Sequence, residues 1–296
     1  MNPHILAFSN YLKFEKRYSQ HTIRAYTDDL LVFFLYIEST YGTLKLEEIS
    51  GPYIRSWLAS VKDQDRSSRT INRKISTLKS FFKFQLKQGQ LQSSPMGQVS
   101  SPKVSKRLPD FVKEKETEVL FQDVEFSADW KGLTDRLVLK LLYQTGMRRS
   151  ELINLRINSV DYHKNQIKVL GKGNKERILP LSPDIARELA AYQAEKKNNF
   201  ETYDSTYLLL TPKGGKLYAG YVYQTVRAYL SLATTIHKKS PHVLRHTFAT
   251  HLMNNGADLN AVKDLLGHSS LAATQVYTHN TIEKLKNVYK KSHPKA

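Results

Sequence analysis

The chain of 296 residues contains no cysteine. This absence excludes disulfide bonds, thiolate catalysis and cysteine-ligated zinc. The HExxH zinc motif and the GxxxxGK[ST] phosphate-binding loop are also missing. No carboxylate stands at metal-ligand spacing from the histidines of the second half, so we expect no metal site.

Long apolar runs are absent as well. No stretch of about 18 apolar residues occurs, which argues against a spanning helix. The opening residues, MNPHILAFSNYLKFEK, lack the apolar core of a signal peptide. We therefore expect a cytoplasmic protein that makes no membrane contact.

Acidic side chains are scarce relative to basic ones: 27 Asp and Glu stand against 45 Lys and Arg, for a net charge of +18. Residues 1–107 contain 17 basic and 8 acidic side chains, and the remainder carries the same excess. Such a charge favours binding of both halves of the chain to a polyanion, most commonly nucleic acid. A membrane surface or a solvated basic face is the alternative.

The periodicity predicts two domains, which are mainly α-helical with a small antiparallel β-sheet in the second. Helices are expected to begin after Ser19, at Ser50 and near Ser67. Residues 93–109 are rich in Ser, Pro and Lys and are interpreted as a linker. Strands at 167–170 and 177–181 would form a β-hairpin. The predicted boundaries are 1–92, 93–109 and 110–296.

The third predicted helix has a basic face opposite its apolar one. Its members recur at steps of three and four residues: Arg69, Arg73, Ser76, Lys79 and Lys83. A solvated helix face is the usual explanation of such a pattern. Because the whole domain is basic, we interpret Arg69, Arg73, Lys79 and Lys83 as facing DNA.

Five short stretches of the second half carry residues suited to phosphoryl transfer. They are GMRRSEL (146–152), GKGNKER (171–177), HVLRH (242–246), LGH (266–268) and VYTH (276–279). Each alone has an ordinary explanation: a surface Arg–Glu pair, a basic hairpin, a structural histidine, a turn, or one of 17 tyrosines. Their order and spacing favour a single site.

The first two stretches supply cations. A planar guanidinium such as that of Arg148 can bond two phosphate oxygens at once. Glu151, three residues later, would lie on the same helix side and hold it. Arg149 would point about 100° away and should not share the task. A hairpin tip with Lys172 and Lys175 could reach into a DNA groove.

The later stretches supply proton-transfer groups and a nucleophile. His242 and Arg245 are neighbours on one helix face, near a helix start at which anions are favoured. His268 would follow the end of a helix. The phenol of Tyr277, with a pKa of about 10, needs its proton removed and the phosphate charge neutralised before it can attack.

Together these motifs resemble the tyrosine site-specific recombinases of the phage integrase family, most closely the bacterial Xer recombinases. The resemblance spans essentially the whole chain. It implies an N-terminal SAM-like core-binding domain and a C-terminal catalytic domain that form a clamp around double-stranded DNA. It also implies cleavage and rejoining through a 3′-phosphotyrosine, with no cofactor.

Carried over motif by motif, the resemblance assigns roles to the cationic residues. Arg148 and Arg245 would bind the non-bridging oxygens of the scissile phosphate, with Glu151 in support. Lys172 would be the general acid toward the leaving 5′-oxygen.

The resemblance also assigns the remaining groups. His242 would assist proton transfer at the tyrosine, His268 would hydrogen-bond a phosphate oxygen, and Tyr277 would be the nucleophile. The chain end, from Ile282–Val288 onward, would dock onto a neighbouring protomer.

The implied function is the resolution of chromosome dimers at a dif-like site, by a homo- or hetero-tetramer on two DNA sites in the nucleoid. The sequence leaves open whether a second Xer-type recombinase and a DNA translocase take part. An integrase or invertase of a mobile element is the main alternative. A type IB topoisomerase, or an accessory DNA-binding protein without activity, fits less well.

Overall fold

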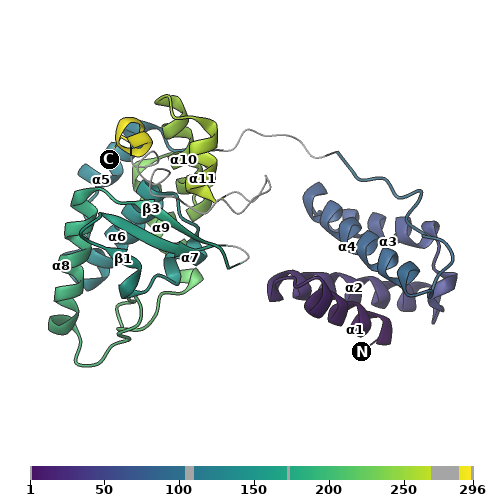
Figure 1. The fold of residues 1–296 in the computed structure, drawn as a ribbon. Coiled ribbons are helices and arrows are strands. Elements are labelled where there is room, and N and C mark those ends of the chain that lie inside the picture. The colour runs from purple at the N-terminus through teal and green to yellow at the C-terminus, as the bar shows by residue number, and fades with distance from the viewer. Residues whose placement is uncertain (1, 104–109, 172–173, 268–286, 295–296) are drawn as a thin grey trace. The chain divides into compact units, whose positions relative to one another are not determined.

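The computed structural model describes residues 2–103, 110–171, 174–267 and 287–294. The chain divides into two compact units, Met1–Arg107 and Leu108–Ala296, each with its own set of elements (Figure 1). Within the described ranges, no helix is long and apolar enough to cross a membrane. Helices predominate, and the predicted fold class is confirmed.

The first unit is a helical bundle. Its α-helices are α1 (Pro3–Asn10), α2 (Gln20–Tyr41), α3 (Gly51–Asp63) and α4 (Ser68–Lys87). The predicted helix starts are confirmed: the Ser19 hydroxyl accepts from the backbone N–H of Thr22, and Ser67 caps α4 in the same way.

Aromatic side chains fill the core of this unit. Phe33, Trp57 and Phe82 are buried and meet edge to face. Met96 and Val99, from the stretch interpreted as a linker, are buried in the same core.

One buried carboxylate joins α2 to α4. Asp29 accepts hydrogen bonds from Arg73, from Lys74 at 2.9 Å and from the Thr77 hydroxyl at 3.0 Å. These bonds offset the desolvation of a side chain that is only 3% exposed.

The second unit combines a small sheet with helices. Its helices are α5 (Glu114–Gln122), α6 (Trp130–Thr145), α7 (Arg149–Ile153), α8 (Pro183–Asn199), α9 (Ala219–Ala233), α10 (Pro241–Asn254) and α11 (Leu259–Leu266). The strands β1 (Val160–Asp161), β2 (Gln166–Leu170) and β3 (Glu176–Pro180) form an antiparallel sheet in the order β1-β2-β3. The predicted hairpin is thus confirmed, with Ile167 opposite Leu179 and Val169 opposite Arg177.

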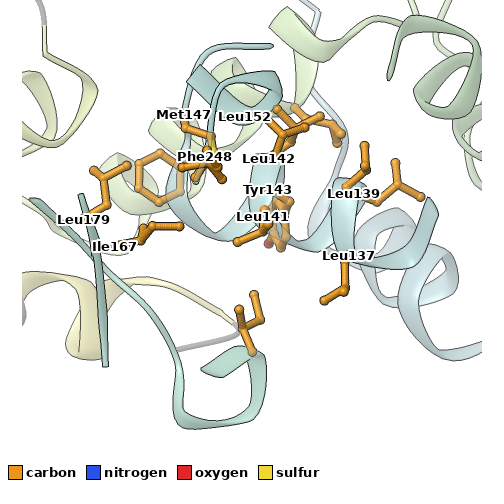
Figure 2. Packing of buried hydrophobic residues seen from close by; sticks show 14 of the residues in the cluster. Leu137, Leu139, Leu141, Leu142, Tyr143, Met147, Leu152, Ile167, Leu179 and Phe248 are labelled. Carbon is orange, nitrogen blue, oxygen red and sulfur yellow. The ribbon is translucent and has the colours of Figure 1, made fainter. Parts of the chain in front are cut away.

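Helix α6 is the centre of this unit (Figure 2), and most of its side chains are buried. It ends at Gly146, whose φ of +61° is left-handed. A Cβ at this position would lie 2.4 Å from Cδ1 of Phe248 on α10. Glycine is therefore required for α10 to approach the end of α6, which is where the GMRRSEL motif begins.

The described end of the chain packs on its own unit. Residues 287–292 are helical, and Tyr289 is buried with its hydroxyl 3.4 Å from Oε1 of Gln144. Asn255 donates to the carbonyl of Ser292. Residues 282–286 of the segment that the resemblance docks onto a neighbouring protomer lie outside the described residues, so that docking stays a prediction.

Replacing Asp29 with alanine should destabilise the first unit by about 3 kcal/mol, since Lys74 and Arg73 lose their buried partner. Urea unfolding of the full chain measures this. The matched control is Asp28→Ala, because Asp28 is exposed and pairs with Arg24 only at 3.8 Å; it should cost less than ~0.5 kcal/mol. Equal losses in the two variants would contradict the role assigned to Asp29.

Candidate active site

The start of α7 positions the first arginine. Arg148 is the residue before the helix, so it lies one position earlier than the helical placement expected from the sequence. Its backbone N–H donates to Oε2 of Glu151 at 2.7 Å, and its Nη1 donates to Oε1 at 2.8 Å. Glu151 therefore fixes the backbone of Arg148 as well as its guanidinium.

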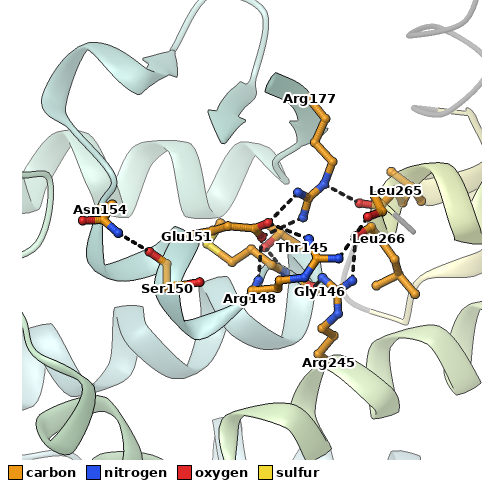
Figure 3. A network of polar contacts seen from close by, with 12 residues as sticks. Thr145, Gly146, Arg148, Ser150, Glu151, Asn154, Arg177, Arg245, Leu265 and Leu266 are labelled. Atoms are coloured by element: carbon orange, nitrogen blue, oxygen red, sulfur yellow. Dashed lines mark hydrogen bonds and ion pairs between the residues drawn. The ribbon is translucent and has the colours of Figure 1, made fainter. Parts of the chain in front are cut away.

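Glu151 is buried and shared between two arginines (Figure 3). From β3, Arg177 donates through Nη1 and Nη2 to the two carboxylate oxygens, at 2.7 and 2.8 Å. Burial raises the pKa of Glu151, but the hydrogen bonds and charge of Arg177, with those of Arg148, outweigh it and hold the pKa below its usual value. The carboxylate is thus ionised at neutral pH.

Arg245 enters the same place from the first turns of α10. Its Nη1 donates to the carbonyl of Gly146 at 2.5 Å and its Nη2 to that of Leu266 at 2.6 Å. Burial, together with the charges of Arg148 and Arg177, lowers the pKa of Arg245 to about 9. The guanidinium remains charged at neutral pH.

The end of α11 is the common acceptor for all three guanidiniums (Figure 3). Arg177 Nε donates to Leu265 at 2.8 Å, Arg245 to Leu266, and Arg148 Nη2 to Gly267 at 2.9 Å. The last carbonyls of a helix lack partners within it and carry partial negative charge. Three successive carbonyls thereby orient three cations.

His242 lies in the first turn of α10, exposed and one turn before Arg245. Partial burial lowers the pKa of His242, and the positive charges of Arg149, Arg245 and Lys238 lower it further. The imidazole is therefore neutral at physiological pH and can accept a proton. Arg149 was expected to point away from Arg148, and the structure gives it a separate effect, since its charge acts on His242.

The structure brings together Arg148, Glu151 and Arg245 and places His242 on the same helix as Arg245. Three further predicted residues, Lys172, His268 and Tyr277, lie outside the described residues. Two of them come directly after described residues: Lys172 follows Gly171, and His268 follows Gly267.

The predicted DNA-binding residues are exposed. On α4 they are Arg69, Arg73, Lys79 and Lys83, and Lys175 lies in the hairpin turn, where its carbonyl accepts from the N–H of Gly171. Arg73 differs from the others because it pairs with Asp29. Their contact with DNA stays a prediction.

Arg177 was not among the site residues predicted from the sequence. The sequence signal for a buried arginine was the alternation of side-chain direction along β3, which places Arg177 on the same inward face as Leu179. An arginine at an inward strand position requires a buried partner, and Glu151 is that partner.

Chemically, the arrangement presents the partly buried guanidinium of Arg148 and the buried guanidinium of Arg245, with a neutral imidazole one helical turn before Arg245. Such donors suit an anion with several oxygens, such as a phosphodiester. Among the described residues, no group of three or more His, Asp or Glu side chains could hold a metal ion.

The sequence of each unit matches the profile of a known protein family. The profile of the phage integrase N-terminal SAM-like domain matches residues 5–89, and that of the phage integrase family matches residues 110–284. The chain therefore belongs to the phage integrase family.

Its relatives lie among the Xer-type enzymes. Tyrosine recombinase XerC of Staphylococcus haemolyticus is 40% identical, over 98% of this chain and 97% of that protein. XerC of Chlorobaculum parvum is 36% identical, over 98% and 94%. The crystal structure of the XerH site-specific recombinase bound to palindromic difH substrate, a post-cleavage complex, has a TM-score of 0.71 at 26% identity, covering 96% of this chain and 83% of that one. The activity of the chain is that of a tyrosine recombinase, which exchanges DNA strands.

Replacing Arg149 with glutamine should raise the pKa of His242, because a repelling positive charge is removed. Titration of the imidazole followed by NMR measures the change. Arg187→Gln is the control, since Arg187 is an exposed residue of α8 that pairs with Asp184, and it should leave the titration unchanged. A pKa that falls or stays constant in Arg149→Gln would show that Arg149 does not act on His242.

Proposed function

We propose that the chain cuts and rejoins duplex DNA at a specific site through a 3′-phosphotyrosine at Tyr277. The observation that carries the proposal is the convergence of Arg148 and Arg245 on the end of α11, with Glu151 between Arg148 and Arg177. Tyr277 follows α11 by eleven residues in the sequence. The segment that contains the nucleophile thus begins where the two cations meet.

The proposed reaction needs no cofactor. The Tyr277 phenol oxygen attacks phosphorus, its proton passing toward His242, and the bond to the 5′-oxygen breaks. Lys172 supplies the proton that makes the leaving group a 5′-hydroxyl. Arg148 and Arg245 stabilise the negative charge on the non-bridging oxygens in the transition state.

His268 donates a further hydrogen bond to a phosphate oxygen. Because the tyrosyl ester conserves the energy of the phosphodiester, the reverse attack by a 5′-hydroxyl rejoins the strand without ATP. The same site therefore performs both cleavage and ligation.

The two domains divide the recognition of DNA. In the proposal, residues 1–92 bind one side of the duplex through the exposed Arg69, Lys79 and Lys83 of α4, and residues 110–296 bind the other side and carry the chemistry. Residues 93–109 connect the two. The net charge of +18 supports contact with many phosphates.

The biological substrate we propose is a dif-like chromosomal site, at which a tetramer on two DNA sites resolves chromosome dimers in the nucleoid. Support comes from the XerC relatives and from the difH-bound XerH structure. A second Xer-type recombinase in the tetramer and an activating DNA translocase belong to the same proposal. Recombination at a site within a mobile element would favour an integrase or invertase instead.

Incubation of the protein with a nicked substrate should give an SDS-resistant adduct, and Tyr277→Phe should abolish it while retaining DNA affinity. The phenol oxygen is the group that forms the ester, whereas binding depends on phosphate contacts. The measurement is gel electrophoresis of the adduct beside a binding titration at several salt concentrations. An adduct that still forms in Tyr277→Phe would show that Tyr277 is not the nucleophile.

Arg245→Lys should slow adduct formation roughly 100-fold or more, because an ammonium cannot bond the Gly146 and Leu266 carbonyls and still reach the phosphate with a planar fork. Single-turnover cleavage at saturating protein measures the rate. Arg187→Lys, an exposed arginine of the same unit, is the matched control. Wild-type rates in Arg245→Lys would remove Arg245 from the catalytic set.

A further inference from the structure

Arg177 is a buried arginine to which the mechanism above gives no task. Its side chain is 5% exposed. Arg177 is the second residue of β3. Its Nη1 and Nη2 donate to Glu151, and its Nε donates to the carbonyl of Leu265. A single side chain thus joins β3, α7 and the end of α11.

Two glycines pack against this side chain. A Cβ at Gly171 would lie 3.3 Å from Arg177 Nη1 and 3.4 Å from Glu151 Oε1. A Cβ at Gly267 would lie 3.1 Å from Arg177 Cδ. Both positions therefore leave room for the guanidinium, and Gly267 also has a left-handed φ of +62° that favours glycine.

These contacts coincide with the residues that flank the proposed catalytic groups. Gly171 directly precedes Lys172, Gly267 directly precedes His268, and Glu151 holds Arg148. We propose that Arg177 is a positioning residue, which fixes Arg148 through Glu151 and sets the chain positions from which Lys172 and His268 begin. This inference rests on the proposed function, which supplies the roles of those three residues.

Stability alone explains the arrangement poorly. A buried ion pair often contributes little net free energy, because desolvation offsets the attraction. Here the burial also places Arg177 near a second cation, Arg245, whose pKa it lowers. An apolar residue at position 177 would avoid that repulsion but could not bond a carboxylate and a helix end at the same time. Only a guanidinium can make both contacts, with its two Nη donors on the carboxylate and its separate Nε donor on the helix end.

The test is single-turnover adduct formation on the nicked substrate, with DNA affinity measured in parallel. Arg177→Met should lower the cleavage rate roughly 100-fold, the cost expected when reacting groups are misplaced by about 1 Å. DNA affinity should be unchanged, because the buried guanidinium reaches no solvent-exposed phosphate. Arg187→Met is the matched control and should cleave at the wild-type rate.

A double-mutant cycle with Glu151→Gln separates positioning from a general effect. If Arg177 acts in part through Glu151, the double variant should lose clearly less cleavage than the product of the two single losses. Losses that multiply would overturn the inference, as would wild-type cleavage in Arg177→Met, or a loss of cleavage matched by a loss of DNA affinity.

Gly171→Ala perturbs the same contact without removing a charge, and it keeps the inference testable if Arg177→Met does not fold by circular dichroism. The added methyl must displace Arg177 Nη1, so cleavage should fall roughly tenfold with DNA affinity retained. Unchanged cleavage in this variant would overturn the inference. An absence of adduct in the wild-type protein would instead overturn the proposed function, and the inference with it.

Discussion

One carboxylate, Glu151, lies among three guanidiniums, and the rest of the second unit is arranged around this excess of positive charge. Arg148, Arg177 and Arg245 bring more positive charge than Glu151 neutralises, in a place where burial already lowers the pKa of Arg245. The end of α11 supplies the remaining negative potential through its last carbonyls. The excess positive charge opposes folding, and an anion that entered the site would relieve it; the proposed binding of phosphate draws on this same repulsion.

The fold gathers these groups from distant parts of the chain. Gly146 lets Phe248 approach the end of α6, which brings Arg245 within reach of the Gly146 carbonyl. The antiparallel pairing of β2 and β3 turns Arg177 inward toward Glu151. The hydrophobic core around α6 thus fixes the positions of α7, α10 and β3. The arginines then hold the end of α11 against these three elements.

Local patterns predicted much of this arrangement. Serine caps, apolar periodicity and a glycine-rich turn identified the helix starts at Ser19 and Ser67 and the hairpin. Motif spacing paired Glu151 with Arg148. The sequence could not reveal that Arg177 shares Glu151, or that three α11 carbonyls accept from three arginines, because those contacts join residues 21 to 119 positions apart. Nor could it show that Arg73 pairs with Asp29, since periodicity reports the exposed face and not the partner.

We propose that Arg148 and Arg245, held by Glu151 and the end of α11, bind the phosphate that Tyr277 attacks. A crystal structure of the protein trapped on a nicked DNA site tests it most directly. We expect a phosphotyrosine at Tyr277 with both guanidiniums within hydrogen-bond distance of its non-bridging oxygens and the Arg177–Glu151 pair intact. A covalent phosphate that lies away from Arg148 and Arg245, or is bonded to another residue, would contradict it.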